Sequence, residues 1–440
     1  MTARLARVVL LGGVLYAALA QGAFYRHQAI VFWPVVFVSA LLAVSGFVVG
    51  SRRWPCREAA WAIPVLASTA ISGAIAGSLD ATVPMLMTIV AVFSALFVGH
   101  LASEIGRRRL VAGLIGVGLL VATTAVIGSV QRYEPWGRLV NGLWRGSSSL
   151  TYSNAAAGLI VAMLLVTISR LASGRRHRLD FVAAHVLVVG AVATLSRGGA
   201  VGLVFGLGVL LLTIGPTVLA RVSAPVLAGS VVSGASVLSM ASEEVTRSPL
   251  LAWAGMALGL CITVVGAERQ HATRVTAFAF SVMFVVLVGV VTIDAVGESG
   301  TSLTDRLTLS DELRAGEWRA AWSEFESQPL VGVGPGRATF RFVVGDETFT
   351  AEFAHQEYLE LAAEQGLMGL VAVLTPITVA IAVLVRRWRR NLDPLIAGCL
   401  AAFIGFLAHS GLDFLWHIPL LPVVVATLVG TALWEPGSES

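Results

Sequence analysis

The chain has 440 residues, of which 56% are hydrophobic and 13% are charged. A soluble domain carries about 25% charged residues, so the composition excludes an ordinary soluble enzyme and indicates an integral membrane protein. The net charge is +4, and all 30 basic residues are arginine because the sequence contains no lysine. The three cysteines are far apart in the sequence, so neither a disulfide framework nor a paired-cysteine metal site is predicted.

Apolar runs near 20 residues long, the length that a helix needs to cross a bilayer, recur along the whole chain. They predict an all-α fold, a polytopic transmembrane helix bundle of about 12–14 spans with a long extracytoplasmic loop that contains short helices. The first span is predicted to be a retained anchor and not a cleaved signal peptide. The fourteen candidate spans cover about residues 7–24, 29–50, 59–79, 81–103, 110–130, 153–173, 180–195, 199–216, 222–241, 249–267, 275–296, 366–385, 394–412 and 418–434.

Arginine clusters in alternate loops orient these spans. With the N-terminus inside, most of the arginines lie on the cytoplasmic side, as the positive-inside rule requires. The basic charge is therefore a topology signal, and no nucleic-acid partner is predicted. We predict a multi-pass protein of the cytoplasmic (inner) membrane, in contact with membrane lipids, whose active site faces the extracytoplasmic side. The clusters lie at 52–57, 107–109, 175–178 and 386–390.

One polar segment interrupts the spans and divides the chain into N-terminal transmembrane helices (1–296), an extracytoplasmic loop (297–365) and C-terminal transmembrane helices (366–440). Polar and charged residues in a membrane protein mark functional sites, so this loop is predicted to carry the catalytic elements. Its spacing predicts that it is mostly helical, with a helix over 311–325 and a glycine-rich turn at 332–336.

Arginines of this loop are candidates for binding an anion. Arg314 lies beside Trp318 on one face of the predicted helix, and tryptophans on that face are expected to anchor it at the membrane interface. Arg337 and Arg341 follow the glycine-rich turn. These cations suit a phosphate-bearing ligand or a lipid headgroup equally well. The turn does not follow a strand of a βαβ unit, so it is not a nucleotide-binding fingerprint.

Arg197 is an outward arginine between two apolar runs, and Gly198 and Gly199 follow it. An arginine at the edge of a membrane is costly, which favours a functional role. An arginine that reaches water and anchors a helix end would look the same. The two interpretations are evenly balanced, and the glycines favour function slightly because they allow a ligand to approach closely.

His355 is the candidate general base, since histidine exchanges protons near neutral pH. It is expected to open the last helix before a span. Leu359 would share its face, and Glu357, Glu360 and Glu364 would form the opposite, wetter side. A single histidine is more often structural, but this one stands with several loop arginines. Because no second histidine lies at i+3 or i+4, no zinc site is predicted, and neither a metal nor a cofactor is expected.

The final outward loop contains His409 and Asp413, which are one helical turn apart. They are expected to form a buried polar pair that bridges helices.

The order of these motifs resembles the O-antigen ligase and O-antigen polymerase superfamily. Ser153 stands where that superfamily commonly has proline, and Gln356 where it often has asparagine. The matching segments are Tyr-Ser-Asn at 152–154, Leu-Ser-Arg-Gly-Gly at 195–199, Arg-x-x-x-Trp at 314–318, Gly-Val-Gly-Pro-Gly at 332–336, His-Gln-x-Tyr-Leu-x-Leu-x-x-Glu-x-Gly-Leu-x-Gly-Leu at 355–370 and His-Ser-Gly-Leu-Asp at 409–413.

The resemblance implies a metal-independent membrane glycosyltransferase that needs no cofactor. Such an enzyme moves a glycan from a polyprenyl-diphosphate-linked oligosaccharide to a hydroxyl of a glycan, lipid or protein acceptor. His355, Arg314 and Arg197 are the predicted catalytic residues, with His355 activating the acceptor and the two arginines binding the diphosphate. Binding of diphosphate or glycan is also predicted for Arg306, Arg319, Arg337 and Tyr358.

Two other classes of function fit part of the pattern. A transporter or flippase of lipid-linked saccharide would also have many spans and outward arginines. Transporters place ionisable residues at mid-membrane depth and show repeated halves, whereas here the charges lie in loops and no repeat is visible. A structural partner in envelope assembly, with no chemistry of its own, would have loop arginine and histidine residues that lie apart from one another in space. The sequence does not distinguish a ligase from a polymerase.

Overall fold

The computed structural model describes residues 2–48, 60–174, 178–268 and 312–433. The chain divides into two compact units. Unit 1 comprises Met1–Leu114, Ser310–Arg390 and Leu407–Ser440, and unit 2 comprises Ile115–Leu309 and Asn391–Phe406. From residue 310 onward, the polar segment that the sequence singles out therefore belongs to unit 1.

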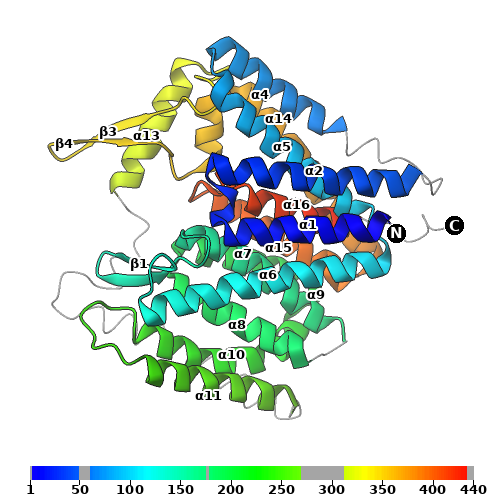
Figure 1. The fold of residues 1–440 in the computed structure, drawn as a ribbon, viewed down its shortest axis with the longest axis vertical. Helices are drawn as coiled ribbons and strands as arrows, with labels where there is room; N and C mark the ends of the chain where they lie inside the picture. Colours follow the sequence, from blue (N-terminus) through cyan, green and yellow to red (C-terminus); the bar gives the residue numbers. More distant parts are fainter. Residues whose placement is uncertain (1, 49–59, 175–177, 269–311, 434–440) are drawn as a thin grey trace. The chain divides into compact units, whose positions relative to one another are not determined.

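Helices dominate the described residues (Figure 1), which confirms the predicted all-α membrane fold. Backbone amides and carbonyls cannot be left unpaired in lipid, so an apolar chain of this kind forms helices. Two 3-10 turns, η1 (Gln21–Ala23) and η4 (Leu415–His417), accompany them. The α-helices are α1 (Thr2–Leu19), α2 (Arg26–Val48), α4 (Ala62–Ala76), α5 (Leu79–His100), α6 (Glu104–Gln131), α7 (Ser153–Ala172), α8 (Arg178–Thr194), α9 (Arg197–Ile214), α10 (Pro216–Leu238), α11 (Pro249–Glu268), α13 (Glu312–Ser327), α14 (Glu357–Asn391), α15 (Pro394–Ser410) and α16 (Leu420–Ala432).

The predicted spans correspond one to one with helices wherever the structure describes them. Within the described ranges, nine helices are long and apolar enough to cross a membrane by length and composition. Three further apolar helices, α4, α15 and α16, are shorter, and α8 has 17 residues. The predicted span at 275–296 lies outside the described residues. Thus the chain is a multi-pass membrane protein, and fourteen spans stays a prediction.

In unit 1, α5 packs against α2, α4 and α16. Small residues allow the closest of these approaches, because a Cβ on Gly99 would lie 2.5 Å from the Thr427 carbonyl oxygen and one on Gly430 would overlap the Leu96 carbonyl. Close packing of small residues replaces the hydrophobic effect as the force that associates helices in lipid. Ser72 of α4 links this group to the polar segment, because its hydroxyl donates to the Val331 carbonyl at 2.7 Å.

In unit 2, α7 is buried along almost its whole length and packs against α8 and α9. Helices α10 and α11 approach each other closely through Gly229 and Gly259. The buried imidazole of His185 on α8 lies 2.8 Å from the Thr263 hydroxyl of α11 and 3.1 Å from the Ser233 hydroxyl of α10. His185 therefore joins three helices by hydrogen bonds, the usual role of polar groups between membrane helices.

Two short antiparallel hairpins lie in the segments predicted to be loops, where no strands were predicted. Strands β1 (Gly137–Val140) and β2 (Leu143–Gly146) pair in unit 2. In unit 1, β3 (Phe340–Val344) pairs with β4 (Glu347–Ala351) and packs on α13 (Figure 1). The polar segment is therefore not mostly helical after its glycine-rich turn. The sequence carried a signal for this hairpin. Apart from Arg341, β3 consists of aromatic and β-branched residues, which favour strands, and Gly345 supplies a left-handed turn with φ 61°.

Helix α14 bends at Gly366, whose φ of 62° and ψ of −162° lie outside the helical region. At this bend the amides of Leu367 and Met368 donate to the carbonyls of Pro329 and Leu330, at 2.8 Å and 3.1 Å. The backbone before the glycine-rich turn thus replaces the helix's own hydrogen bonds. This pairing fixes the turn against the first two turns of α14, which carry Glu357, Glu360 and Glu364.

Replacing Gly366 with alanine is expected to destabilise the protein by about 1–3 kcal/mol, because these dihedral angles are accessible essentially to glycine alone. The added Cβ would also overlap the backbone of Leu330. The melting temperature in detergent measures the effect. Gly12→Ala is the matched control, because an added Cβ on this exposed glycine of α1 meets nothing within 4 Å, so it should be neutral or slightly stabilising. Equal melting temperatures for the two variants would contradict the prediction.

Candidate active site

His355 lies in the loop between β4 and α14 and forms an ion pair with a carboxylate. Its Nδ1 is 3.0 Å from Oε2 of Glu317 on α13, and the two side chains are 29% and 10% exposed. The prediction that His355 opens the helix is wrong, because α14 begins at Glu357 and His355 has a left-handed φ of 47°. This left-handed residue ends the loop just before the helix starts.

The surroundings of His355 favour its charged form. Burial alone would lower the pKa of His355, but the hydrogen bond from Nδ1 to Glu317 and the charge of Asp413 outweigh burial and raise the pKa above its usual value. Glu317 is itself buried, so its carboxylate is shielded from water. A carboxylate held on Nδ1 orients the imidazole and leaves Nε2 for proton exchange with a substrate.

Arg314 lies three residues before Glu317 on α13, so the two side chains share a face of that helix. Its Nη1 donates a hydrogen bond to the Leu412 carbonyl at 3.1 Å. The ring of Phe414, two residues further on, meets the His355 imidazole edge to face at 5.0 Å. Two of the three predicted catalytic residues, Arg314 and His355, are therefore joined through α13 and the loop that follows α15.

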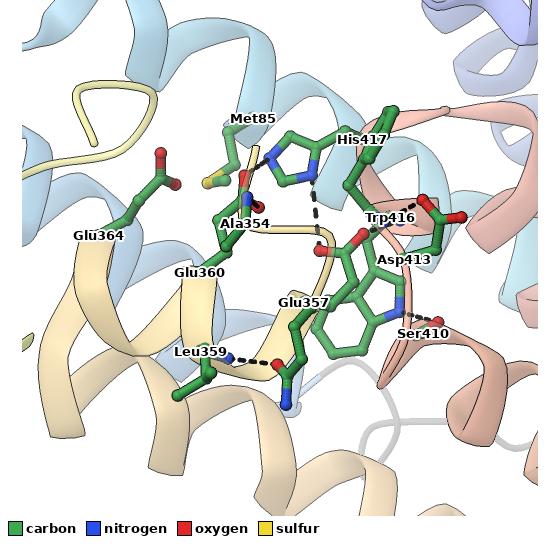
Figure 2. A network of polar contacts seen from close by, with 12 residues as sticks. Met85, Ala354, Glu357, Leu359, Glu360, Glu364, Ser410, Asp413, Trp416 and His417 are labelled. Carbon is green, nitrogen blue, oxygen red and sulfur yellow. Dashed lines mark hydrogen bonds and ion pairs between the residues drawn. The ribbon is translucent and has the colours of Figure 1, made fainter. Parts of the chain in front are cut away.

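The three glutamates at the start of α14 do not face water, contrary to the prediction. Glu357, Glu360 and Glu364 are only 2–3% exposed. Figure 2 shows the His417 ring between two of them, with Nε2 3.3 Å from Glu360 Oε1 and Nδ1 3.5 Å from Glu357 Oε2. The face that was predicted to be exposed to water packs instead against η4. No contact between these glutamates and His417 was predicted.

His417 is held in its charged form by these carboxylates. Burial opposes the positive charge, but Glu360 and Glu357 outweigh it and raise the pKa of His417 to about 10. Within the described residues, no group of three histidine, cysteine or acidic side chains has an arrangement that could hold a metal ion. The imidazolium of His417 lies within ion-pair distance of Glu357 and Glu360 and offsets their charge.

Each buried glutamate also holds one loop through a backbone amide. Glu360 Oε2 accepts from the Ala354 amide at 2.9 Å, and Glu364 Oε1 accepts from the Gly336 amide at 2.7 Å. Glu357 Oε1 accepts from the Trp416 amide. Ala354 immediately precedes His355, so Glu360 positions the loop that carries the candidate base. The acidic stripe of α14 thus fixes three loops to one helix end.

The glycine-rich turn is confirmed as a turn, and its glycines are required for their conformation. Gly332, Gly334 and Gly336 have φ values of 70°, 107° and 65°, which other residues rarely adopt. The amide of Val333 donates to the Ala363 carbonyl at 3.0 Å, and that of Gly334 donates to the Glu364 carbonyl at 2.9 Å. These bonds place the turn along α14 next to its bend.

The remaining candidates of unit 1 have separate environments. Arg337 is exposed and donates from Nη1 to the Ala76 carbonyl. Arg319 is exposed and donates from Nε to the Ala315 carbonyl of its own helix at 3.2 Å. The Tyr358 hydroxyl donates to the Leu407 carbonyl at 2.8 Å, an anchoring contact to α15. Arg306 lies outside the described residues. None of these contacts assigns a ligand, so the binding roles stay predictions.

The expected pairing of His409 and Asp413 does not take the form of a hydrogen bond. Both residues are buried, with 1% and 0% exposed. Among the residues that the structure describes, neither ring nitrogen of His409 has a hydrogen-bond partner. The Asp413 carboxylate instead accepts from the Phe414 amide at 2.9 Å, which shapes the loop that faces His355.

Arg197 belongs to unit 2, where it is the first residue of α9. Ser196 caps that helix, because its hydroxyl accepts from the Gly199 amide at 3.1 Å. The same hydroxyl donates to Asn154 Oδ1 at 2.9 Å, and Arg145 Nη2 donates to that oxygen at the same distance. Two predicted motifs, at 152–154 and 195–199, are thus brought together in unit 2, together with Arg145, which the sequence analysis missed.

Comparison with known proteins supports the resemblance seen in the motifs. Residues 244–374 match the family model described as O-antigen ligase. The matched region contains the polar segment with Arg314, Glu317 and His355 and ends within α14. No curated protein sequence matches the chain.

Proposed function

We propose that this chain, whose residues 244–374 match the O-antigen ligase family model, moves a glycan from a polyprenyl-diphosphate carrier to an acceptor hydroxyl. The apolar helices support a multi-pass membrane protein. The family match supports an enzyme of glycosyltransferase type with a lipid-linked glycan substrate. The proposal adds the carrier, a site on the extracytoplasmic face of the cytoplasmic membrane, and catalysis without a metal ion.

The observation that carries the proposal is the His355–Glu317 pair. In the proposed reaction His355 Nε2 takes the proton from the acceptor hydroxyl as its oxygen attacks the anomeric carbon. The bond between that carbon and the diphosphate breaks, and the diphosphate leaves with the electron pair. Glu317 accepts from Nδ1–H at 3.0 Å and stabilises the imidazolium that forms, as the acidic partner of a catalytic histidine does.

The leaving diphosphate needs positive charge that does not depend on a metal. Guanidinium groups bind phosphates through two parallel hydrogen bonds and remain charged at every physiological pH. In the proposal Arg314 binds the diphosphate and stabilises its developing charge. A diphosphate-binding role for Arg197, which belongs to unit 2, stays a separate prediction. One nitrogen of Arg314 is engaged by the Leu412 carbonyl, which orients the side chain and leaves its other N–H groups for the ligand. Arg306 and Arg319 are further candidates for the same ligand.

A transfer assay tests this function. Purified protein is incubated with a polyprenyl-diphosphate-linked oligosaccharide and an acceptor, with and without EDTA, and the products are separated by size. We expect elongated or acceptor-linked glycan in both conditions, and a ladder of sizes would identify a polymerase. Loss of product on adding EDTA would contradict the metal-independent mechanism. Movement of the lipid-linked saccharide across a vesicle membrane without any transfer would favour the transporter instead.

A further inference from the structure

An open cavity of about 490 Å³ lies at the surface of unit 1 between α4, α13 and the glycine-rich turn, and two of its residues, Gln328 and Arg337, are exposed. Ligand sites in proteins commonly have volumes of about 300–1,000 Å³, so this one is large enough for a small molecule or for one end of a longer one. Its residues play no part in the His355–Glu317 pair. They are Ile75, Ala76, Glu324, Gln328, Val333 and Arg337.

The polar side chains of the cavity offer complementary hydrogen-bonding groups. Glu324 supplies acceptors, Gln328 supplies both donors and an acceptor, and Arg337 supplies donors. Within the described part of the chain, no hydrogen bond or ion pair engages the side chain of Glu324 or of Gln328. Among the described residues, Arg337 is held by the Ala76 carbonyl through Nη1 alone, which leaves its other N–H groups available to a ligand. All three side chains can therefore bind a ligand with several hydroxyls.

The charges in the cavity argue against a phosphate. Glu324 places a carboxylate in the same cavity as Arg337, and a carboxylate repels a diphosphate. A neutral compound with many hydroxyls fits better, because a hydroxyl donates to a carboxylate and accepts from a guanidinium. The apolar side chains of Ile75 and Val333 supply a surface for the C–H groups of such a compound. This chemistry is that of a sugar, and it differs from the diphosphate role considered for Arg337.

Helix α13 relates this cavity to the candidate base. Glu317 and Glu324 are seven residues apart, so they lie on the same face of the helix, about 10 Å apart along its axis at a rise of 1.5 Å per residue. Gln328 directly follows the last residue of α13, and its amide donates to the Phe325 carbonyl at 3.2 Å, which holds it next to the last turn of the helix. A chain of sugars whose reacting hydroxyl is at His355 would then reach the cavity with its next one or two rings.

We propose that this cavity is a saccharide subsite, in which Glu324, Gln328 and Arg337 bind sugar rings remote from the reacting atoms. This subsite rests on the proposed function, because the glycan that it would bind is the substrate of the proposed transfer. The ligand is the glycan of the acceptor or that of the lipid-linked donor, and both present the same hydroxyls to the cavity.

Direct binding tests the subsite without turnover. The probes are the reducing oligosaccharide released by mild acid from the host's lipid-linked glycan, and inorganic pyrophosphate, each titrated into the full-length protein in detergent. We expect Glu324→Ala combined with Gln328→Ala to raise the Kd for the oligosaccharide at least about tenfold, since two or more hydrogen bonds are lost. The Kd for pyrophosphate should change less than about twofold. A melting curve confirms that each variant is folded.

Glu326→Gln is the matched control, because Glu326 is an exposed acid of the same helix that bonds to Trp322 Nε1, and it should bind the oligosaccharide like the wild type. The more conservative Glu324→Gln should weaken sugar binding less than the double variant. Unchanged oligosaccharide binding in the folded double variant would overturn the proposal. So would a large gain in pyrophosphate affinity in Glu324→Gln, which would identify a phosphate site.

Transfer kinetics show whether the bound glycan belongs to the acceptor or to the lipid-linked donor. They also test the subsite and the proposed transfer reaction separately. A raised KM for the acceptor alone assigns the subsite to the acceptor, and a raised KM for the lipid-linked donor alone assigns it to the donor. Weakened oligosaccharide binding in a protein that shows no transfer would retain the subsite and refute the proposed reaction. Normal transfer with unchanged Kd and KM in the double variant would refute the subsite and retain the reaction.

Discussion

Replacing His355 with alanine is expected to lower the rate of glycan transfer about 10²–10⁴-fold, the usual contribution of a positioned general base. The variant should still bind the lipid-linked donor, because the proposed diphosphate contacts come from arginines. Transfer rates and donor affinities of purified proteins measure the two effects. His27→Ala is the control, since His27 is an exposed histidine of unit 1 at the start of α2, and its rate should equal that of the wild type. A wild-type rate in the His355 variant would remove this residue from the mechanism.

The pH dependence of the transfer rate tests the role of Glu317, the carboxylate paired with His355. A general base works in its neutral form, so the wild-type rate should rise with pH through a pKa that Glu317 and Asp413 hold above the usual value for histidine. Glu317→Gln keeps a hydrogen-bond acceptor but removes the charge, so the acid limb should move to lower pH while the maximal rate falls. Glu326→Gln should leave the limb in place. An unmoved limb in Glu317→Gln would show that Glu317 does not set the protonation of His355.

Replacing His417 with alanine is expected to destabilise the protein by about 3–5 kcal/mol, the cost of breaking a buried ion pair and leaving its charged partners uncompensated. Glu357 and Glu360 would then face each other with no cation between them. The melting temperature in detergent should fall strongly at neutral pH. Adding Glu360→Gln to the variant should restore part of the loss, because it removes one of the two unpaired charges and keeps an acceptor for the Ala354 amide.

The pH dependence of stability gives an independent readout for His417. A folded-state pKa raised to about 10 means that the stabilisation is fully present below the unfolded value of about 6.5 and is lost as pH rises through about 10. The melting temperature of the wild type should therefore fall between pH 7 and 10 and approach that of His417→Ala. His27→Ala should follow the wild type throughout. Parallel curves for wild type and His417→Ala would contradict the charged pair.

Local patterns in the sequence determined the helices, the turn and several of the candidate residues. The predicted helix at 311–325 is α13, the turn at 332–336 has the left-handed glycines that it needs, and every described span has its helix. These features depend on neighbours within one or two turns of the chain, because helical periodicity and bilayer length are local properties. Residues 340–351 also have a local pattern that favours a hairpin. It was not used, because the loop was predicted to be mostly helical.

Only the tertiary structure decided which groups are paired and which are buried. The sequence shows a histidine at 355 and glutamates at 357, 360 and 364. Only the structure shows that His355 meets Glu317 of α13, and that Glu357 and Glu360 meet His417 more than fifty residues away. A helical pattern separates two faces without showing which one water reaches, so the acidic face was predicted to be wet when it is buried. Burial and charge pairing depend on what the fold brings within 3–4 Å, and those contacts set the protonation of His355 and His417.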